Sequence, residues 1–145
     1  MTLIELIIAC AILMVLSSAA LPIAKYTIIR QREAELRRDL REMKDAIDRY
    51  KDAADRNQIR VEIGSEGYPP DLETLVKGVQ LGASSDRKIR FLRKIPVDPM
   101  TGRAEWGLRA VQDDPDSTSW GGKNVFDVYS KSTGTALDGT RYSDW

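Results

Sequence analysis

The sequence predicts an α+β fold in which one long N-terminal helix carries a small antiparallel β-sheet head. An uncharged apolar run opens the chain, an amphipathic pattern with a period of about 3.6 residues follows, and short β-prone runs between turn residues fill the second half. The 145 residues leave room for one compact domain and one appendage. We expect a protruding apolar helix over 1–24, an amphipathic helix packed on the head over 25–57, and a globular head with a C-terminal loop over 58–145.

The composition excludes several classes of function. Lys and Arg together number 22, as do Asp and Glu, so the chain lacks the positive excess that attracts a nucleic-acid backbone, and no nucleic-acid partner is expected. Histidine is absent, and the single cysteine, Cys10, lies inside the apolar run. Hydrolytic triads, His-based zinc sites and internal disulfides are therefore excluded. We expect a protein that is not an enzyme.

The apolar run from Leu6 to Ala24 contains nineteen residues and no charge. As a helix it spans roughly 28 Å, close to the ~30 Å hydrocarbon core of a bilayer. A cleaved signal peptide and a buried core helix are the alternatives. A signal peptide begins with basic residues, whereas here Glu5 precedes the run and the cations Lys25 and Arg30 follow it. We expect a membrane-spanning helix, and a basic leader removed from before Met1.

Glu5 places a charge at the edge of the apolar run. A carboxylate at the centre of a membrane span costs about 2.5 to 3.5 kcal/mol, so we expect this one to have a cationic partner. The nearest candidate is the α-amine of Met1, of the same chain or of a neighbour in an assembly. A neighbour's amine would neutralise both groups as the helices stack.

The amphipathic segment repeats apolar residues at spacings of three and four, which predicts one narrow stripe on a helix. We expect this stripe to pack on the head; a coiled-coil dimer is the alternative, although only about three heptads are present. Acid-before-base pairs at i, i+4 favour an uninterrupted solvated rod. The stripe is Leu36, Leu40, Met43, Ile47, Tyr50 and Ala54, and the pairs are Glu33 with Arg37, Asp45 with Arg49, and Asp52 with Arg56.

Ser17, Ser18 and Pro22 form the weak point of the predicted helix. Proline removes one i to i−4 hydrogen bond, and its ring clashes with the carbonyl of residue 18. We expect a kink or a melted stretch there.

The head begins with a predicted short helix. The residues Pro-Pro-Asp at 69–71 precede Leu72 and Leu75, a pattern typical of a helix start, and Gly78 or Gly82 marks its end. A linker should follow.

Two β-prone runs then predict antiparallel strands over 104–111 and 125–130. The turn residues of 95–102 lead into the first strand, and Gly121-Gly122 is expected to mark the bend between the two. Two or three strands would cover the helix stripe on one face and meet solvent on the other.

Both ends of the chain resemble a known family. The opening Met1-Thr2-Leu3-Ile4-Glu5-Leu6, the apolar run and Pro22 are similar to the mature N-terminus of the type IV pilin superfamily, although Phe is usual where Met1 stands. The run 124–130, Asn-Val-Phe-Asp-Val-Tyr-Ser, resembles the end of the major pseudopilins of type II secretion systems. The tail through Asp138-Gly139 to Asp144-Trp145 and the Pro-Val-Asp-Pro turn at 96–99 are similar to the same proteins.

The resemblance implies a structural subunit of a helical filament, most like a major pseudopilin that drives protein export. The alternatives are a pilin of a type IV pilus, with a role in adhesion or motility, and, with weaker support, a single-span periplasmic binding protein. The implied location is the bacterial inner membrane with the head in the periplasm, and then a periplasmic or cell-surface filament. The implied partners are further copies, prepilin peptidase, assembly-platform proteins and minor pilins or pseudopilins. The implied assembly residues are Met1, which would also be N-methylated, Glu5 and Pro22.

The resemblance also implies a calcium ion in the C-terminal loop. Calcium takes six to eight oxygen ligands. The alternative is that Asp138-Gly139 forms a tight turn, that Trp145 holds the tail by packing, and that Arg141, which stands where the family has acidic residues, forms a salt bridge. The candidate calcium ligands are Asp127, Ser130, Ser132, Asp138 and Asp144.

Overall fold

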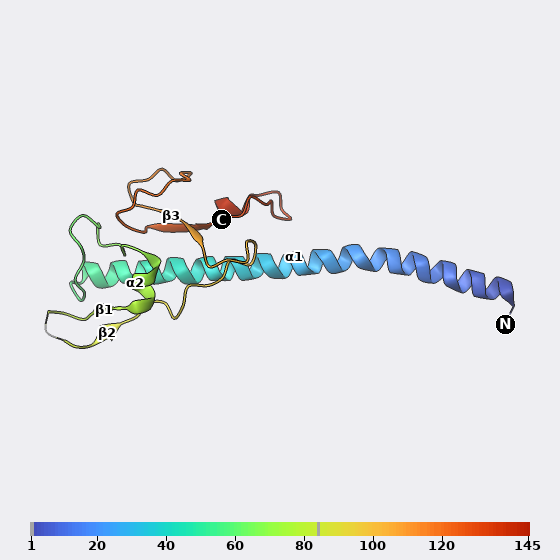
Figure 1. The fold of residues 1–145 in the computed structure, drawn as a ribbon, viewed down its shortest axis with the longest axis horizontal. Helices are drawn as coiled ribbons and strands as arrows, with labels where there is room; N and C mark the ends of the chain where they lie inside the picture. Colours follow the sequence, from blue (N-terminus) through green and yellow to red (C-terminus); the bar gives the residue numbers. More distant parts are fainter. Residues whose placement is uncertain (1, 84) are drawn as a thin grey trace.

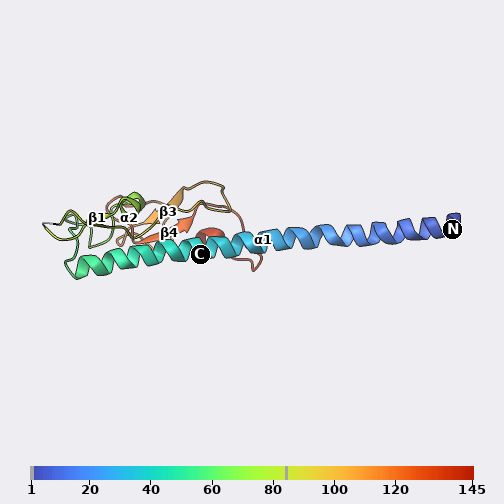
Figure 2. The same ribbon diagram turned by 90° about the horizontal axis from the view of Figure 1, so that it is seen from below.

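The computed structural model of the protein describes residues 2–83 and 85–145. Helix α1 (Leu3–Asp55) runs the length of the molecule, and the rest of the chain packs against its C-terminal part (Figures 1 and 2). The fold is α+β, as predicted. The elements after α1 are α2 (Leu72–Lys77), β1 (Val79–Gln80), β2 (Lys88–Ile89), β3 (Trp106–Arg109), β4 (Asp127–Ser130) and the 3-10 turn η1 (Tyr142–Asp144).

Helix α1 passes through Pro22 without interruption, so the expected melted stretch is wrong. Figure 1 shows a gentle curve along this part of the helix and no sharp kink. Proline removes one backbone hydrogen bond, whereas melting a stretch would remove several and leave their donors and acceptors unpaired. The hydroxyls of Ser18 and Thr27 also donate to the carbonyls of Val15 and Ile23, on either side of the proline.

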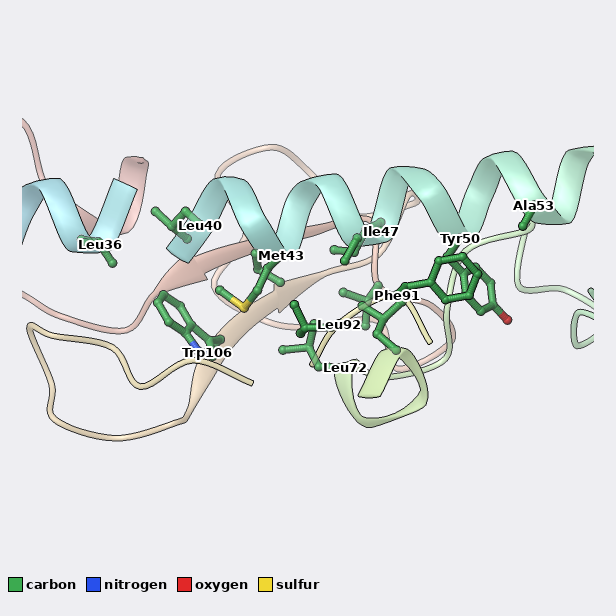
Figure 3. Packing of buried hydrophobic residues seen from close by; sticks show 14 of the residues in the cluster. Leu36, Leu40, Met43, Ile47, Tyr50, Ala53, Leu72, Phe91, Leu92 and Trp106 are labelled. Atoms are coloured by element: carbon green, nitrogen blue, oxygen red, sulfur yellow. The ribbon is translucent and has the colours of Figure 1, made fainter. Parts of the chain in front are cut away.

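The C-terminal part of α1 forms one wall of the core through the predicted stripe. All six stripe residues are buried. Figure 3 shows the side chains of Leu72, Phe91, Leu92 and Trp106 packed against this face of the helix. Docking on the head is therefore confirmed, and the stripe is covered rather than open to a second helix.

Helix α2 is the short helix that the sequence predicts. Asp71 is its N-cap, and its carboxylate accepts hydrogen bonds from both the backbone N–H and the hydroxyl of Thr74, at 2.7 and 2.8 Å. The helix ends at Gly78, where φ is +82° and an added Cβ would lie 2.6 Å from the carbonyl oxygen of Ile89. Only glycine fits this close approach.

Within the residues that the structure describes, four strands form two separate two-stranded antiparallel sheets. Strands β3 and β4 lie within the two predicted runs, are shorter than them, and pair from Trp106 with Ser130 to Arg109 with Asp127. Strand β4 packs on α1. The pair β1 and β2 lies in the segment predicted to be a linker, which corrects that prediction. Each of these strands has only two residues, too few to show an alternating pattern in the sequence.

The cross-strand neighbours Gly107 and Tyr129 shape the β3–β4 sheet. An added Cβ at Gly107 would lie 2.2 Å from the Tyr129 ring, so glycine makes room for the aromatic ring to lie across the strand. The guanidinium carbon of Arg109 lies 4.1 Å from the centroid of the same ring. The Tyr129 hydroxyl donates to the carbonyl of Thr118 at 3.3 Å, which ties the loop 110–126 to the sheet.

The loop 110–126 connects β3 to β4, so the predicted bend at Gly121-Gly122 lies inside a long loop and is not a tight turn. The carboxylate of Asp113 organises this loop by accepting the backbone N–H groups of Ala110 and Gly121 at 2.7 and 2.9 Å. These two hydrogen bonds hold the pKa of Asp113 below its ordinary value, and the one from Ala110 has the larger effect.

Candidate assembly surface and C-terminal clasp

The N-terminal half of α1 exposes its apolar side chains on every side. Among the described residues, helix α1 is long enough and apolar enough to cross a membrane, and none of its most apolar stretch is buried. The exposed fractions reach 75% at Leu3 and 73% at Met14. A helix that is apolar all round needs lipid or other helices around it. The predicted protruding half is therefore present, and it includes Pro22.

Glu5 lies in a capping box at the start of α1. Its carboxylate accepts the backbone N–H of Thr2 at 2.7 Å, and its own N–H donates to the Thr2 hydroxyl at 3.4 Å. The Thr-x-x-Glu spacing is the signal from which this cap is predictable, and our sequence reasoning missed it. The carboxylate thus has an uncharged partner within its own chain. The predicted roles of Met1, in pairing and in N-methylation, lie outside the described residues.

The C-terminal tail is fastened to α1 by a group of contacts that we call the C-terminal clasp: those of Glu33, Arg37 and Lys44 with the segment 137–145. Oε1 of Glu33 accepts two hydrogen bonds at 2.9 Å, from the Leu137 N–H and the Tyr142 hydroxyl. Lys44 Nζ donates to the main-chain oxygen of Trp145 at 3.4 Å. The clasp begins just before Leu36, the first buried residue of α1.

The Trp145 side chain closes the clasp. The guanidinium carbon of Arg37 lies 4.2 Å from the centroid of its ring, an attractive cation–π contact. The ring also meets Tyr142 edge-on with centroids 5.2 Å apart, and its Nε1 donates to the Thr140 hydroxyl at 2.7 Å. The packing of Trp145 that the sequence offered as the alternative to calcium is therefore found.

The i, i+4 ion pairs that the sequence predicts on α1 do not appear among the salt bridges of the described residues. Arg37 instead reaches Asp138 at 3.5 Å, and Arg49 donates to the carbonyl of Phe91 at 2.8 Å. Long side chains on the head-facing borders of the helix find partners in the head. The prediction was wrong because it assumed that the side chains of Arg37 and Arg49 face only solvent and helix neighbours.

The five candidate calcium ligands have other partners. Asp127 lies 3.2 Å from Lys44 Nζ and 3.6 Å from the Arg109 guanidinium. The Ser130 hydroxyl donates to the buried carboxylate of Asp98 at 2.5 Å. The Ser132 hydroxyl accepts the backbone N–H of Gly134 at 3.2 Å.

The remaining two candidate ligands lie in the tail. Asp138 accepts the hydroxyl and the backbone N–H of Thr140 at 2.6 and 2.9 Å, and these bonds, with the charge of Arg37, lower its pKa. Asp144 pairs with Arg141 at 3.3 Å. Within the described residues, no group of three or more acidic, histidine or cysteine side chains is arranged to hold a metal. Each of the five candidate side chains has a partner within the protein, and calcium binding stays a prediction.

The molecule thus divides into an apolar helix open to its surroundings and a head held on the other half of the same helix (Figure 1). Comparisons with protein-family models, curated proteins and solved structures find no match for this chain.

Proposed function

We propose that this chain is a structural subunit of a type IV pilin-like helical filament, most like the major pseudopilin of a type II secretion system that drives protein export. The observation that supports this most strongly is the division of α1. Its C-terminal half is the buried wall of the head core, whereas its N-terminal half exposes apolar side chains in every direction. A lone soluble domain would gain nothing from such an extension. Removing its apolar surface from water is favourable by roughly 25 cal/mol per Å², and this needs lipid or neighbouring helices.

The exposed half has two environments in this proposal. Before assembly it spans the bacterial inner membrane with the head in the periplasm. In the filament, the same side chains pack against the helices of neighbouring copies, while the heads lie outside. The uninterrupted helix transmits the position of the bundled half to the head, because α1 belongs to both. The protein is a building block rather than an enzyme, and its partners are prepilin peptidase, assembly-platform proteins, minor pilins or pseudopilins, and its own copies.

Glu5 is the assembly residue of this proposal. In the described chain its carboxylate caps its own helix through the Thr2 N–H. A neighbour's α-amine brings a full charge to the same carboxylate, and a charge-assisted hydrogen bond is roughly twice as strong as a neutral one. Assembly therefore gives Glu5 a better partner than the monomer does.

A surface type IV pilus is the second candidate, since it would use the same helix. The resemblance favours the pseudopilus, because ordinary type IV pilins often close the C-terminal loop with a disulfide, and the single cysteine of this chain, Cys10 on α1, cannot form an internal one. Mechanical shearing of cells separates the two. Shear releases a surface pilus into the medium, whereas a pseudopilus stays with the cells.

Sedimentation after removal of detergent tests the proposal. The full chain, extracted gently from membranes, should pellet as thin regular fibres visible by electron microscopy. The chain beginning at Lys25 is the control, because it keeps every buried core residue and lacks most of the exposed apolar residues. It should stay in the supernatant. A full chain that remains a monomer or dimer would favour a single-span protein with a periplasmic binding head.

Calcium at the C-terminal loop is proposed only through the resemblance. Melting curves of the full chain with added calcium and with a chelator test it. Binding to the folded state alone would raise the melting temperature with calcium. Identical curves would leave the clasp as what orders the tail.

A further inference from the structure

A groove of about 740 Å³ lies between α1 and the segment that follows β2. Its walls carry four arginines against two acidic side chains: Arg49 from the helix, Arg56 directly after its end, and Arg90 and Arg93 from the segment. Arg49 donates to the carbonyl of Phe91 at 2.8 Å, which fixes the segment to the helix and keeps the groove's shape. We call this the arginine groove.

The arginine groove has positive charge that the chain does not use internally. Among the described residues, Arg56, Arg90 and Arg93 are exposed and form no salt bridge. They belong to the most basic stretch of the chain, since five of the eight residues from 87 to 94 are Lys or Arg. The chain as a whole carries no net charge, so this excess must be balanced elsewhere on it.

The complementary charge lies in the loop between β3 and β4. Three of the four residues from 113 to 116 are aspartates. Asp113 is turned inward by its two backbone hydrogen bonds, which hold the loop in shape. Asp114 and Asp116 are exposed, and neither forms a salt bridge within the described residues. We call residues 113–116 the acidic loop.

The two features lie on opposite flanks of the head. In Figure 1, strands β1 and β2 lie below α1, while the loop between β3 and β4 lies above it. Figure 2 shows that both flanks belong to the side of α1 that carries the head. Because the flanks lie on opposite sides, a contact between them joins two copies head to tail, and repetition of such a contact gives a ring or an open helical series rather than a closed pair.

We propose that the acidic loop of one copy docks in the arginine groove of the next copy along the filament. Asp114 and Asp116 would pair with Arg90, Arg93 and Arg56 of the neighbour, and Asp113 would keep its structural role. This contact deepens the proposed function and rests on it. It sets the order and spacing of the heads, while the apolar helices supply the cohesion, since charge complementarity contributes specificity more than affinity.

A second copy fits the groove better than a free polyanion does. Glu42 and Asp52 lie in the groove among the arginines, so a uniformly negative chain would meet two like charges there. A short loop with two exposed carboxylates needs only the arginines. Each copy carries one acidic loop and one arginine groove, so the two halves of the contact are present in equal numbers.

Disulfide trapping tests the contact in the fibres that the full chain forms after removal of detergent. Cys10→Ala removes the native thiol, and Arg93→Cys with Asp114→Cys places one cysteine in each half of the contact. Under mild oxidation we expect a ladder of trimers and longer species. The single-cysteine chains should give no ladder. The head-to-tail contact would be overturned if dimers are the only cross-linked product. It would also be overturned if the chain forms fibres but gives no cross-linked product.

Charge reversal gives the second arm. In the chain without the introduced cysteines, Arg90→Glu with Arg93→Glu should reduce the yield of ordered fibres by roughly tenfold or more, because like charges then face each other. Adding Asp114→Lys and Asp116→Lys to the charge-reversed groove should restore fibre formation. Arg103→Glu with Lys131→Glu is the control, an equal change in charge at two exposed positions outside both features. It should leave the fibres unchanged.

The outcomes separate the contact from the filament itself. If the unaltered chain forms fibres and the groove reversal leaves their number and order unchanged, the docking contact is wrong and the filament proposal stands. If the unaltered chain forms no fibres and the Arg93→Cys, Asp114→Cys chain gives no ladder, both are wrong.

Discussion

The hydroxyl of Tyr142 donates a hydrogen bond to Oε1 of Glu33 at 2.9 Å, across 109 positions of sequence. The same oxygen accepts the backbone N–H of Leu137. Glu33 lies one turn before the first buried residue of α1, Leu36. The last turn of the chain is thereby fixed to the helix at the place where the helix leaves the head, so the tail and the exposed apolar half meet at one boundary.

Tyr142→Phe tests the clasp. It removes the hydroxyl and keeps the ring that packs on Trp145, so the chain beginning at Lys25 should lose about 1.5 to 3 kcal/mol of unfolding free energy, as expected for a hydrogen bond to a charged group. Tyr68→Phe is the matched control, because the Tyr68 ring contacts Lys51 and Phe126 while its hydroxyl has no hydrogen bond within the described residues. Urea denaturation measures both. Equal losses would contradict the clasp.

The clasp should also respond to acid. Hydrogen bonds from the Thr140 hydroxyl and N–H, with the charge of Arg37, hold the pKa of Asp138 below its ordinary value of 3.8. A carboxylate whose folded pKa is lowered stabilises the fold above its unfolded pKa, and this contribution is lost as the pH falls through the lowered pKa. The tail should therefore loosen below about pH 4.

The indole N–H resonance of Trp145, which reports its bond to Thr140, follows this loosening. Asp138→Asn should weaken the tail already at neutral pH and remove the transition that Asp138 causes. Asp114→Asn, which changes an exposed carboxylate outside the clasp, should leave it in place. A transition that is the same in all three chains would show that Asp138 is not its source.

The docked stripe predicts a strong difference between two adjacent residues of α1. Leu40 is 3% exposed and packs in the core, whereas Arg41 is exposed. Leu40→Ala should cost about 2 to 5 kcal/mol of unfolding free energy because it leaves a cavity. Arg41→Ala should cost less than about 0.5 kcal/mol. If both substitutions shift the melting temperature of the chain beginning at Lys25 equally, the result would contradict docking on the head and favour the coiled-coil dimer.

The elements with a clear period were predictable from the sequence. Six apolar residues at spacings of three and four identify the buried face of α1, because such spacings place side chains on one face of a helix. The Pro-Pro-Asp turn and Gly78 similarly mark the two ends of α2. Strands β3 and β4 fall inside the predicted runs, since β-branched and aromatic residues gather there.

The parts that depend on long-range contacts were not predictable. Arg37 was assigned to Glu33, four residues away, but it pairs with Asp138 and stacks on Trp145, more than a hundred residues away. No local pattern shows which border of a helix a tail will cover. The strands β1 and β2 pair over a short separation, Val79 with Ile89 and Gln80 with Lys88, but two residues are too few to show a period in the sequence. The Thr2–Glu5 capping box, in contrast, was present in the sequence as a local spacing.

Glu5→Gln separates the two roles of Glu5. Glutamine also serves at the third position of a capping box, so the start of α1 should keep its cap while the negative charge is lost. We expect unchanged helix content by circular dichroism and a marked fall in fibre yield, because a neighbour's α-amine no longer finds an opposite charge. Fibres of the Glu5→Gln chain that grow as fast and as long as those of the unaltered chain would show that charge pairing does not drive assembly.

Electron cryo-microscopy of the purified full chain, followed by helical reconstruction, tests the central claim most directly. The claim is that the apolar half of α1, which is exposed in the single chain, becomes the core of a filament. The account predicts a thin regular fibre with the helices of residues 3–24 bundled along its axis and the heads on the outside. A sample that stays monomeric or dimeric, or a fibre in which these helices lie on the surface, would contradict it.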